Sequence, residues 1–140
     1  MARILLVDPN GLTAEHASQV LMAAGHSCGW VTSAEEAMRV IEHHRPDVLL
    51  LEDMLPGESG TGLLRSLKLS HRFHDLPVIM LTTTQDIGEE KAAFQFGAQD
   101  YIRKPFDPSM LQFRVRQALD ARPRDGRARS AETGLNTQQA

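Results

Sequence analysis

Residues 45–57 read Arg-Pro-Asp-Val-Leu-Leu-Leu-Glu-Asp-Met-Leu-Pro-Gly, and this stretch decides the fold. Its apolar run, residues 48–51, follows a Pro-Asp pair and is closed by a Pro-Gly pair. A short apolar run between turn signals is typical of a strand buried on both faces, as in a parallel sheet. Because the run ends at Glu52 and Asp53, we expect a carboxylate at the carboxyl edge of the sheet. In open α/β sheets, ligands bind at that edge.

The same apolar character recurs along the chain and alternates with helical periodicity. Strands are predicted at 3–7, 27–31, 48–52, 76–82 and 100–102. Helices are predicted from Thr13 to Ala24, from Ser33 to about His43, from Leu63 to about His71, from the Asp86 cap to Phe96, and from Asp107 to Ala121. Alternating strands and helices predict an α/β fold, a doubly wound five-stranded parallel sheet with five helices on its two faces.

Composition and charge indicate one acidic domain in a chain of 140 residues. Residues 1–121 hold 11 basic and 16 acidic residues, a net charge of −5, which makes nucleic acid an unlikely partner for this surface. Residues 122–140 lack apolar periodicity, so we expect a disordered tail or linker. The absence of a membrane-length apolar run and of a signal-peptide pattern, with Cys28 as the only cysteine, predicts a cytoplasmic protein.

Four chemically complementary residues follow or end the predicted strands. Strands one, three, four and five end at Asp8, Glu52, Thr82 and Lys104. On parallel strands these side chains could converge, with carboxylates for a hard cation such as Mg²⁺ and a hydroxyl and an ammonium for phosphoryl oxygens. One carboxylate could also act as a nucleophile and form an acyl phosphate. The alternatives are ordinary strand-end polar residues or an internal salt bridge without turnover.

In this order and spacing, several segments resemble the receiver domain of two-component response regulators, a flavodoxin-like domain. The segments that carry the resemblance are Ile4–Asp8, Pro46–Glu52, Leu55-Pro56 with Gly60, Pro77–Thr82 and Gly97–Phe106. The resemblance covers residues 3–121, which we therefore interpret as one receiver domain. Such a domain is a signalling module and not an enzyme, apart from its own phosphorylation.

The resemblance implies specific roles for the strand-end residues. The family accepts a phosphoryl group from a histidine kinase on an aspartate four residues before the loop proline, a position held here by Glu52. Thr82 would hold the phosphoryl group and Lys104 would pair with it. Tyr101 is the aromatic residue that would swing inward on activation. The Lys104–Pro105 peptide bond would be cis, as cis bonds are a proline phenomenon.

Two positions depart from the family pattern. The acceptor is Glu52 instead of aspartate, and Pro9 replaces the second acid after strand one, which is a principal Mg²⁺ ligand in the family. The remaining metal ligands would be Asp8, Glu52 and the backbone carbonyl of Met54. That is a poor cage for an ion that requires near-octahedral geometry. Asp53 could replace Glu52 as acceptor, but side-chain alternation along a strand should point it away.

These departures favour an atypical receiver that does not use the Mg²⁺-dependent phosphoryl cycle and acts by protein–protein interaction or dimerisation. The extra methylene of Glu52 would bring its carboxylate towards Lys104 and Thr82, where it could replace part of the phosphoryl charge. The alternative is an orthodox receiver, phosphorylated by a histidine kinase with Mg²⁺ at Asp8 and Glu52. A flavodoxin-like cofactor binder would need a phosphate loop after strand one, and residues 9–11 do not resemble one.

A second group of charged residues lies on the fourth helix, the fifth strand and the fifth helix. Its members are Lys91, Asp100, Arg103, Arg114 and Arg116. Many members of the family form dimers through ion pairs on this face. The sequence leaves open whether the group is a homodimer interface or a solvated charged face.

Overall fold

The computed structural model describes residues 1–121 of the chain, in which strands and helices alternate as expected. The strands are β1 (Arg3–Val7), β2 (Ser27–Val31), β3 (Val48–Leu51), β4 (Val78–Thr82) and β5 (Asp100–Arg103). The helices are α1 (Gly11–Ala23), α2 (Ala34–His43), α3 (Gly60–Leu69), α4 (Ile87–Gln95) and α5 (Pro108–Ala121). The predicted tail or linker at 122–140 lies outside the described residues.

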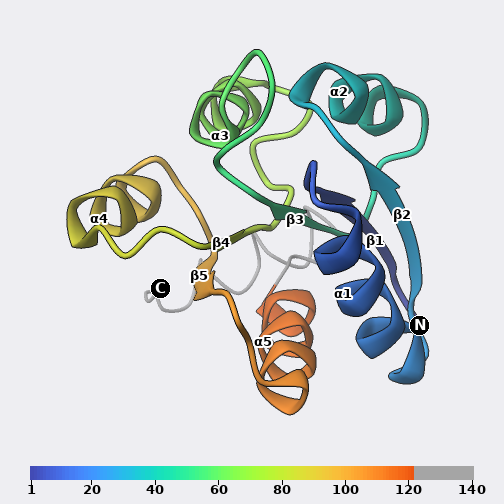
Figure 1. The fold of residues 1–140 in the computed structure, drawn as a ribbon. Helices are drawn as coiled ribbons and strands as arrows, with labels where there is room; N and C mark the ends of the chain where they lie inside the picture. The colour runs from blue at the N-terminus through green and yellow to red at the C-terminus, as the bar shows by residue number, and fades with distance from the viewer. Residues whose placement is uncertain (122–140) are drawn as a thin grey trace, which may run out of the picture.

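All strand pairs are parallel, and the five strands form one sheet in the order β2-β1-β3-β4-β5. Figure 1 shows α1 and α5 on one face of this sheet and α2, α3 and α4 on the other. The predicted doubly wound, five-stranded α/β fold is therefore confirmed. Its connections place the carboxyl ends of all strands at one edge, where ligand sites of such folds lie.

The apolar run of β3 is buried because the sheet is covered on both faces. Leu49 and Leu51 pack into the core beneath α2, α3 and α4. Val48 and Leu50 pack into the second core beneath α1 and α5. Successive side chains of a strand point to opposite faces, so a strand between two helical layers must be apolar at every position.

Helix α1 begins earlier than the apolar pattern predicted. The sequence placed its start at Thr13, but the helix starts at Gly11 with Asn10 as its N-cap. The Asn10 side chain accepts hydrogen bonds from the backbone N–H groups of Leu12 and Thr13. Gly11 has no side chain and Leu12 is largely exposed, so the first two helical residues give no periodic apolar signal.

Helix α3 also differs: it starts at Gly60, three residues before the predicted start at Leu63, and ends at Leu69 instead of about His71. Ser59 is its N-cap and accepts a hydrogen bond from the N–H of Gly62. Two glycines in the first turn hide the helical pattern. Strand β4 likewise starts at Val78, two residues later than predicted.

Gly60 allows α3 to begin directly against the end of β3. A Cβ atom at this position would lie 2.2 Å from the backbone oxygen of Glu52 and 2.8 Å from the Cα of Asp53. Its backbone N–H donates to the carbonyl of Asp53 over 2.8 Å. Both obstacles are backbone atoms, so a larger residue must displace the segment that carries Glu52.

We expect Gly60→Ala to destabilise the domain by about 1–3 kcal/mol, the usual cost of forcing an extra carbon into a packed site. The matched control is Gly62→Ala in the same turn, where a Cβ meets the flexible, exposed side chain of Glu58. The control should be neutral or stabilising by up to about 1 kcal/mol, because alanine is the better helix former. Urea denaturation of both variants measures the difference, and equal stabilities would contradict the close approach at Gly60.

Candidate functional site

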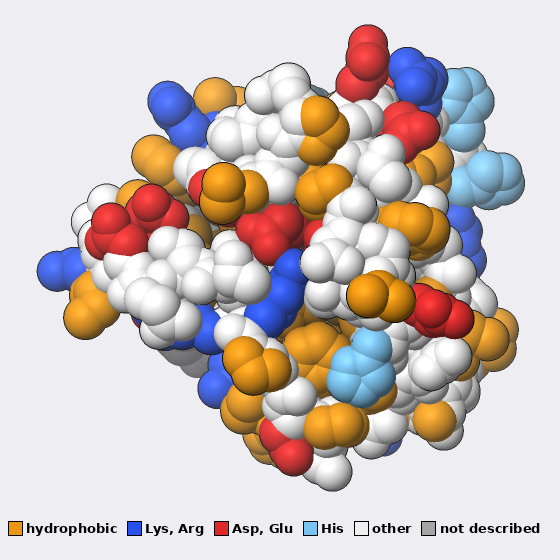
Figure 2. Space-filling model, in the orientation of Figure 1, with side chains coloured by type: hydrophobic (Ala, Val, Ile, Leu, Met, Phe, Trp, Pro, Cys, Tyr) orange, Lys and Arg blue, Asp and Glu red, His pale blue; other side chains and the backbone are white. Residues whose placement is uncertain are grey.

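Four residues at the carboxyl ends of the strands form the site. Asp8 directly follows β1, Glu52 follows β3, Thr82 ends β4 and Lys104 follows β5. Within residues 1–121, Asp8, Glu52 and Thr82 are the buried polar or charged side chains. The structure thus brings together the four residues that the sequence singled out, and we call them the carboxyl-edge cluster. Figure 2 shows acidic and basic side chains side by side in the middle of this face, bordered by hydrophobic and neutral surface.

Lys104 lies between the two carboxylates of the cluster. Its Nζ is 2.6 Å from Oδ2 of Asp8 and 2.8 Å from Oε1 of Glu52. All three side chains are at most 9% exposed. Short, charge-assisted hydrogen bonds of this kind are much stronger in a dry site than at the surface, so the ammonium holds the ends of β1 and β3 together.

The second carboxylate oxygen of Glu52 receives three further hydrogen bonds. The backbone N–H groups of Asp53 and Met54 donate to Oε2 over 2.7 and 3.1 Å. The hydroxyl of Thr82 donates to the same oxygen over 2.7 Å. The family resemblance implies that Thr82 and Lys104 would hold a phosphoryl group. In this structure both of them bind the Glu52 carboxylate instead.

Asp8 is also fully hydrogen-bonded, partly through residues that the sequence did not reveal. Oδ1 accepts from the backbone N–H of Asn10 over 2.8 Å, and the backbone N–H of Asp8 donates to the carbonyl of Val31 over 3.0 Å. The backbone oxygen of Asp8 accepts from the indole Nε1 of Trp30 over 2.7 Å. Trp30 lies at the end of the edge strand β2, and no local pattern in the sequence links it to Asp8.

Asp53 serves the neighbouring loop instead of the cluster. Its Oδ1 accepts from the backbone N–H of Thr61 over 2.8 Å and from the Thr61 hydroxyl over 2.6 Å. This carboxylate thus stabilises the first turn of α3, where negative charge is favourable. The expected alternation holds, since the carboxylates of Glu52 and Asp53 bind different parts of the structure.

Tyr101 and Pro105 lie where the resemblance expects them. The Tyr101 ring is buried beside Phe94, with ring centroids 6.4 Å apart, and the guanidinium of Arg103 lies 5.5 Å from its ring centre. Burial raises the pKa of the Tyr101 phenol, and the nearby carboxylate of Glu89 adds to this effect. The Lys104–Pro105 peptide bond is cis, as predicted.

The charged residues of the α4–β5–α5 face are engaged mainly within the chain. Arg103 pairs with Glu90 over 2.7 Å, and Arg114 pairs with Asp100 over 2.8 Å. Arg116 makes only a longer, exposed contact of 3.7 Å with Asp120 on its own helix. Lys91 is exposed on α4. These ion pairs place Asp100, Arg103 and Arg114 on the α4–β5–α5 face. Arg116 follows Gln112 by one helical turn, and the Gln112 side chain donates to the carbonyl of Val20 in α1, so Arg116 lies towards the α1 side of α5.

The cluster does not fit a divalent cation as it stands. Each carboxylate oxygen of Asp8 and Glu52 already accepts at least one hydrogen bond, and the Lys104 ammonium lies between the two groups. Pro9 adds no side-chain ligand. Nowhere in residues 1–121 do three or more His, Cys, Asp or Glu side chains form a group that could hold a metal ion. A Mg²⁺ ion would have to displace the ammonium and still find most of its ligands in water.

Comparison with known proteins places this chain in a family. The response regulator receiver domain family matches residues 4–116. The chain is 38% identical over 116 residues to the phosphate regulon transcriptional regulatory protein PhoB of Pseudomonas aeruginosa, covering 83% of this chain and 51% of PhoB. It is 36% identical over 117 residues to the DNA-binding response regulator MtrA of Mycobacterium tuberculosis, covering 84% of this chain and 50% of MtrA. The chain thus spans about half the length of these curated relatives.

Solved structures give the same assignment. A response regulator from Chloroflexus aurantiacus has a TM-score of 0.82 and 36% identity, over 85% of this chain and 98% of that one. The signal receiver domain of a histidine kinase from Syntrophus aciditrophicus has a TM-score of 0.82 and 30% identity, over 89% of this chain and 95% of that one. This chain belongs to the response regulator receiver domain family. Receiver domains are signalling domains of two-component systems, not enzymes, and they interact with histidine kinases and other signalling proteins.

The described part of the chain can also be searched for membrane-spanning helices. Between residues 1 and 121, no helix combines the length and the apolar character that a membrane crossing requires.

We expect Lys104→Met to destabilise the domain by about 3–5 kcal/mol, because removing one partner leaves buried carboxylates without a counter-charge. The control, Arg116→Met, removes an exposed cation from α5 and should change stability by less than about 0.5 kcal/mol. The free energies of unfolding in urea at neutral pH test both values. Similar losses in the two variants would contradict a dominant role for the buried ammonium.

Proposed function

We propose that this receiver domain signals without the Mg²⁺-dependent phosphoryl cycle and that the Glu52 carboxylate takes the place of a phosphoryl group. The contact that carries this proposal is the bond from Lys104 Nζ to Glu52 Oε1, with the Thr82 hydroxyl on Oε2. In a domain of this kind, output would depend on binding partners or on dimerisation instead of on phosphorylation.

The side-chain length of Glu52 supports this proposal. Glutamate is one methylene longer than aspartate, so its carboxylate extends further towards Thr82 and Lys104 from the same backbone position. The buried Thr82 hydroxyl and the inward Tyr101 ring are the arrangement that the family resemblance connects with activation. One negative charge replaces the roughly two of a phosphoryl group, so the replacement is partial.

Hydrogen bonding at the cluster also disfavours phosphoryl transfer. An attacking carboxylate oxygen must be free and aligned with the donor, and displacements of roughly 1 Å are costly in such reactions. Both oxygens of Glu52 are bound, one to the ammonium and the other to three donors. The competing proposal is the orthodox function, supported by the identity to PhoB and MtrA, in which a kinase or small donor phosphorylates this site.

Incubation with acetyl phosphate and Mg²⁺, followed by intact-mass spectrometry, tests the two proposals. We expect the wild-type protein to gain no phosphoryl group. The Pro9→Asp, Glu52→Asp double variant should gain one, because it restores an aspartate nucleophile and a second metal ligand. Pro9→Asp, Glu52→Gln is the matched control and should stay unmodified.

Phosphorylation of the wild type would overturn the atypical function, and peptide mapping would then identify the acceptor among Asp8, Glu52 and Asp53. A double variant that folds but remains unmodified would show that other features of the site block the chemistry, contrary to the role given to Pro9 and Glu52. Circular dichroism of each variant establishes that it is folded.

We further propose that the α4–β5–α5 face forms a homodimer. Support comes from large apolar side chains that α4 and α5 leave exposed beside the ion pairs of this face: Ile87, Phe94, Met110 and Phe113. Exposed Lys91 lies on the same helix as Ile87 and Phe94. Neighbouring apolar side chains with a charged border are typical of protein–protein interfaces.

Phe113→Glu should weaken self-association at least tenfold in sedimentation equilibrium, because it puts a charge among the apolar side chains of this face. Leu69→Glu is the matched control, since Leu69 is an exposed leucine at the end of α3, away from this face. It should leave association unchanged. A wild type that remains monomeric up to millimolar concentration, or equal effects of the two changes, would contradict the dimer.

A further inference from the structure

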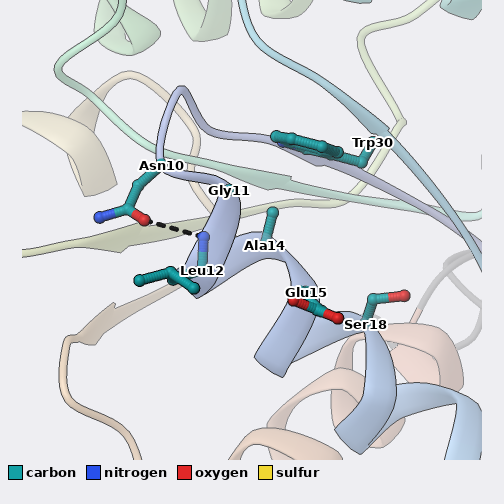
Figure 3. Close-up of a pocket in the computed structure, with 7 residues that line it drawn as sticks. All are labelled: Asn10, Gly11, Leu12, Ala14, Glu15, Ser18 and Trp30. Carbon is teal, nitrogen blue, oxygen red and sulfur yellow. Dashed lines mark hydrogen bonds between the residues drawn. The ribbon is translucent and has the colours of Figure 1, made fainter.

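A cavity of about 630 Å³ opens between α1 and β2, away from the α4–β5–α5 face. Residues from the start of α1 line it together with Trp30 of β2: Asn10, Gly11, Leu12, Ala14, Glu15 and Ser18. Figure 3 shows the Trp30 ring across from Gly11 and Ala14, with Glu15 and Ser18 further along α1. The volume falls within the range of specific binding pockets.

The Trp30 indole is held in place and yet half exposed. Its Nε1 donates to the backbone oxygen of Asp8, which fixes the orientation of the ring. The ring lies close to Gly11, where a Cβ atom would be 3.4 Å from the ring atom Cη2, an ordinary van der Waals contact. Nevertheless 48% of Trp30 is exposed, and neighbouring Leu12 is 81% exposed. Tryptophan is among the residues enriched at binding hot spots, and its indole offers a large apolar surface to a partner.

Glu15 gives the cavity its charge. It is the only charged residue in the lining, and among residues 1–121 its carboxylate has no hydrogen-bond or ion-pair partner. The surrounding domain carries −5 over residues 1–121, from 11 basic and 16 acidic residues. An aromatic face beside an unpaired carboxylate complements a cation.

The geometry points to an arginine side chain of a partner protein as the occupant of this cavity. A guanidinium can stack flat on the indole and present two N–H groups to the Glu15 carboxylate, which the compact ammonium of lysine cannot do. Leu12 would contact an apolar side chain next to that arginine. This cavity is separate from the carboxyl-edge cluster, so its occupancy does not depend on how Glu52 works.

Most arginines of the described domain are poor candidates for this role in a second copy. Six already contact a carboxylate, a backbone carbonyl or an aromatic ring of their own domain: Arg3, Arg45, Arg65, Arg72, Arg103 and Arg114. Arg39 and Arg116 make only exposed contacts of 4.0 and 3.7 Å, so a second copy is a competing occupant in the test. A partner protein would supply an arginine without first breaking such a contact. The arginines at 122–140 are treated as a competing occupant in the test.

The sole tryptophan makes the test direct, because the chain has a single indole N–H resonance. We would titrate the full chain with the peptide acetyl-Leu-Arg-amide and follow that resonance by ¹H–¹⁵N NMR. We expect a saturable shift with millimolar affinity. The citrulline peptide, a neutral isostere of the arginine peptide, should bind at least fivefold more weakly.

Glu15→Gln should weaken arginine-peptide binding at least threefold. The matched control, Glu42→Gln, removes the same charge from an exposed position on α2 and should have no effect. An unsaturable shift, equal binding of the citrulline peptide or equal effects of the two variants would overturn the proposal. So would movement of the free-protein resonance on dilution, which would indicate a second copy as occupant. Tighter peptide binding after all four tail arginines are replaced by glutamine would assign the cavity to the chain's own tail and also overturn it.

Discussion

The buried ammonium of Lys104 is the interaction on which the arrangement of the carboxyl edge depends. It lies 2.6 Å from one carboxylate and 2.8 Å from another, in a site from which water is nearly excluded. Each buried carboxylate would cost several kcal/mol without such a partner. Backbone N–H groups and the Thr82 hydroxyl donate to the carboxylate oxygens that the ammonium does not contact, so every oxygen of the two carboxylates accepts a hydrogen bond.

Through these bonds, one side chain links loops that are far apart in the sequence. Asp8 and Lys104 are 96 residues apart, and Glu52 and Lys104 are 52 apart. Behind the cluster, the close approach of Gly60 fixes the backbone of Glu52, and the Asp53–Thr61 bonds fix the next turn. The sheet, the loop after β3 and the Lys104 ammonium therefore all fix the position of the Glu52 carboxylate. As a result, the site has little freedom to rearrange.

The fold and the members of the cluster could be predicted from the sequence, because both follow from strand periodicity. A run such as 48–51 between turn signals is typical of a strand between two helical layers, and parallel strands bring Asp8, Glu52, Thr82 and Lys104 to one edge. The contacts within the site could be predicted only in part. An ion pair between Glu52 and Lys104 was expected, but the bridge from Lys104 to Asp8 was not.

The features that sequence reasoning missed are those without a periodic signal. Asn10 and Ser59 cap helices whose first turns hold glycine or exposed residues, so the apolar pattern began too late. The bond from the Trp30 indole to the carbonyl of Asp8 joins two strands through a side chain and a backbone atom. Only the three-dimensional register of β1 and β2 brings those two groups together.

The presence of both Pro9 and Glu52 can be explained by the number of charges at the carboxyl edge. The family pattern has a second acid at the position of Pro9, which with Asp8 and the acceptor gives three carboxylates against one ammonium. That net charge of −2 suits a divalent cation. With Pro9, two carboxylates face one ammonium, and the net charge is only −1. A buried cluster with less uncompensated charge depends less on a metal ion for its stability, and the Lys104 ammonium contacts both acids. Pro9 and Glu52 therefore support the same proposal, that an ion pair and hydrogen bonds within the protein take the place of a bound ion.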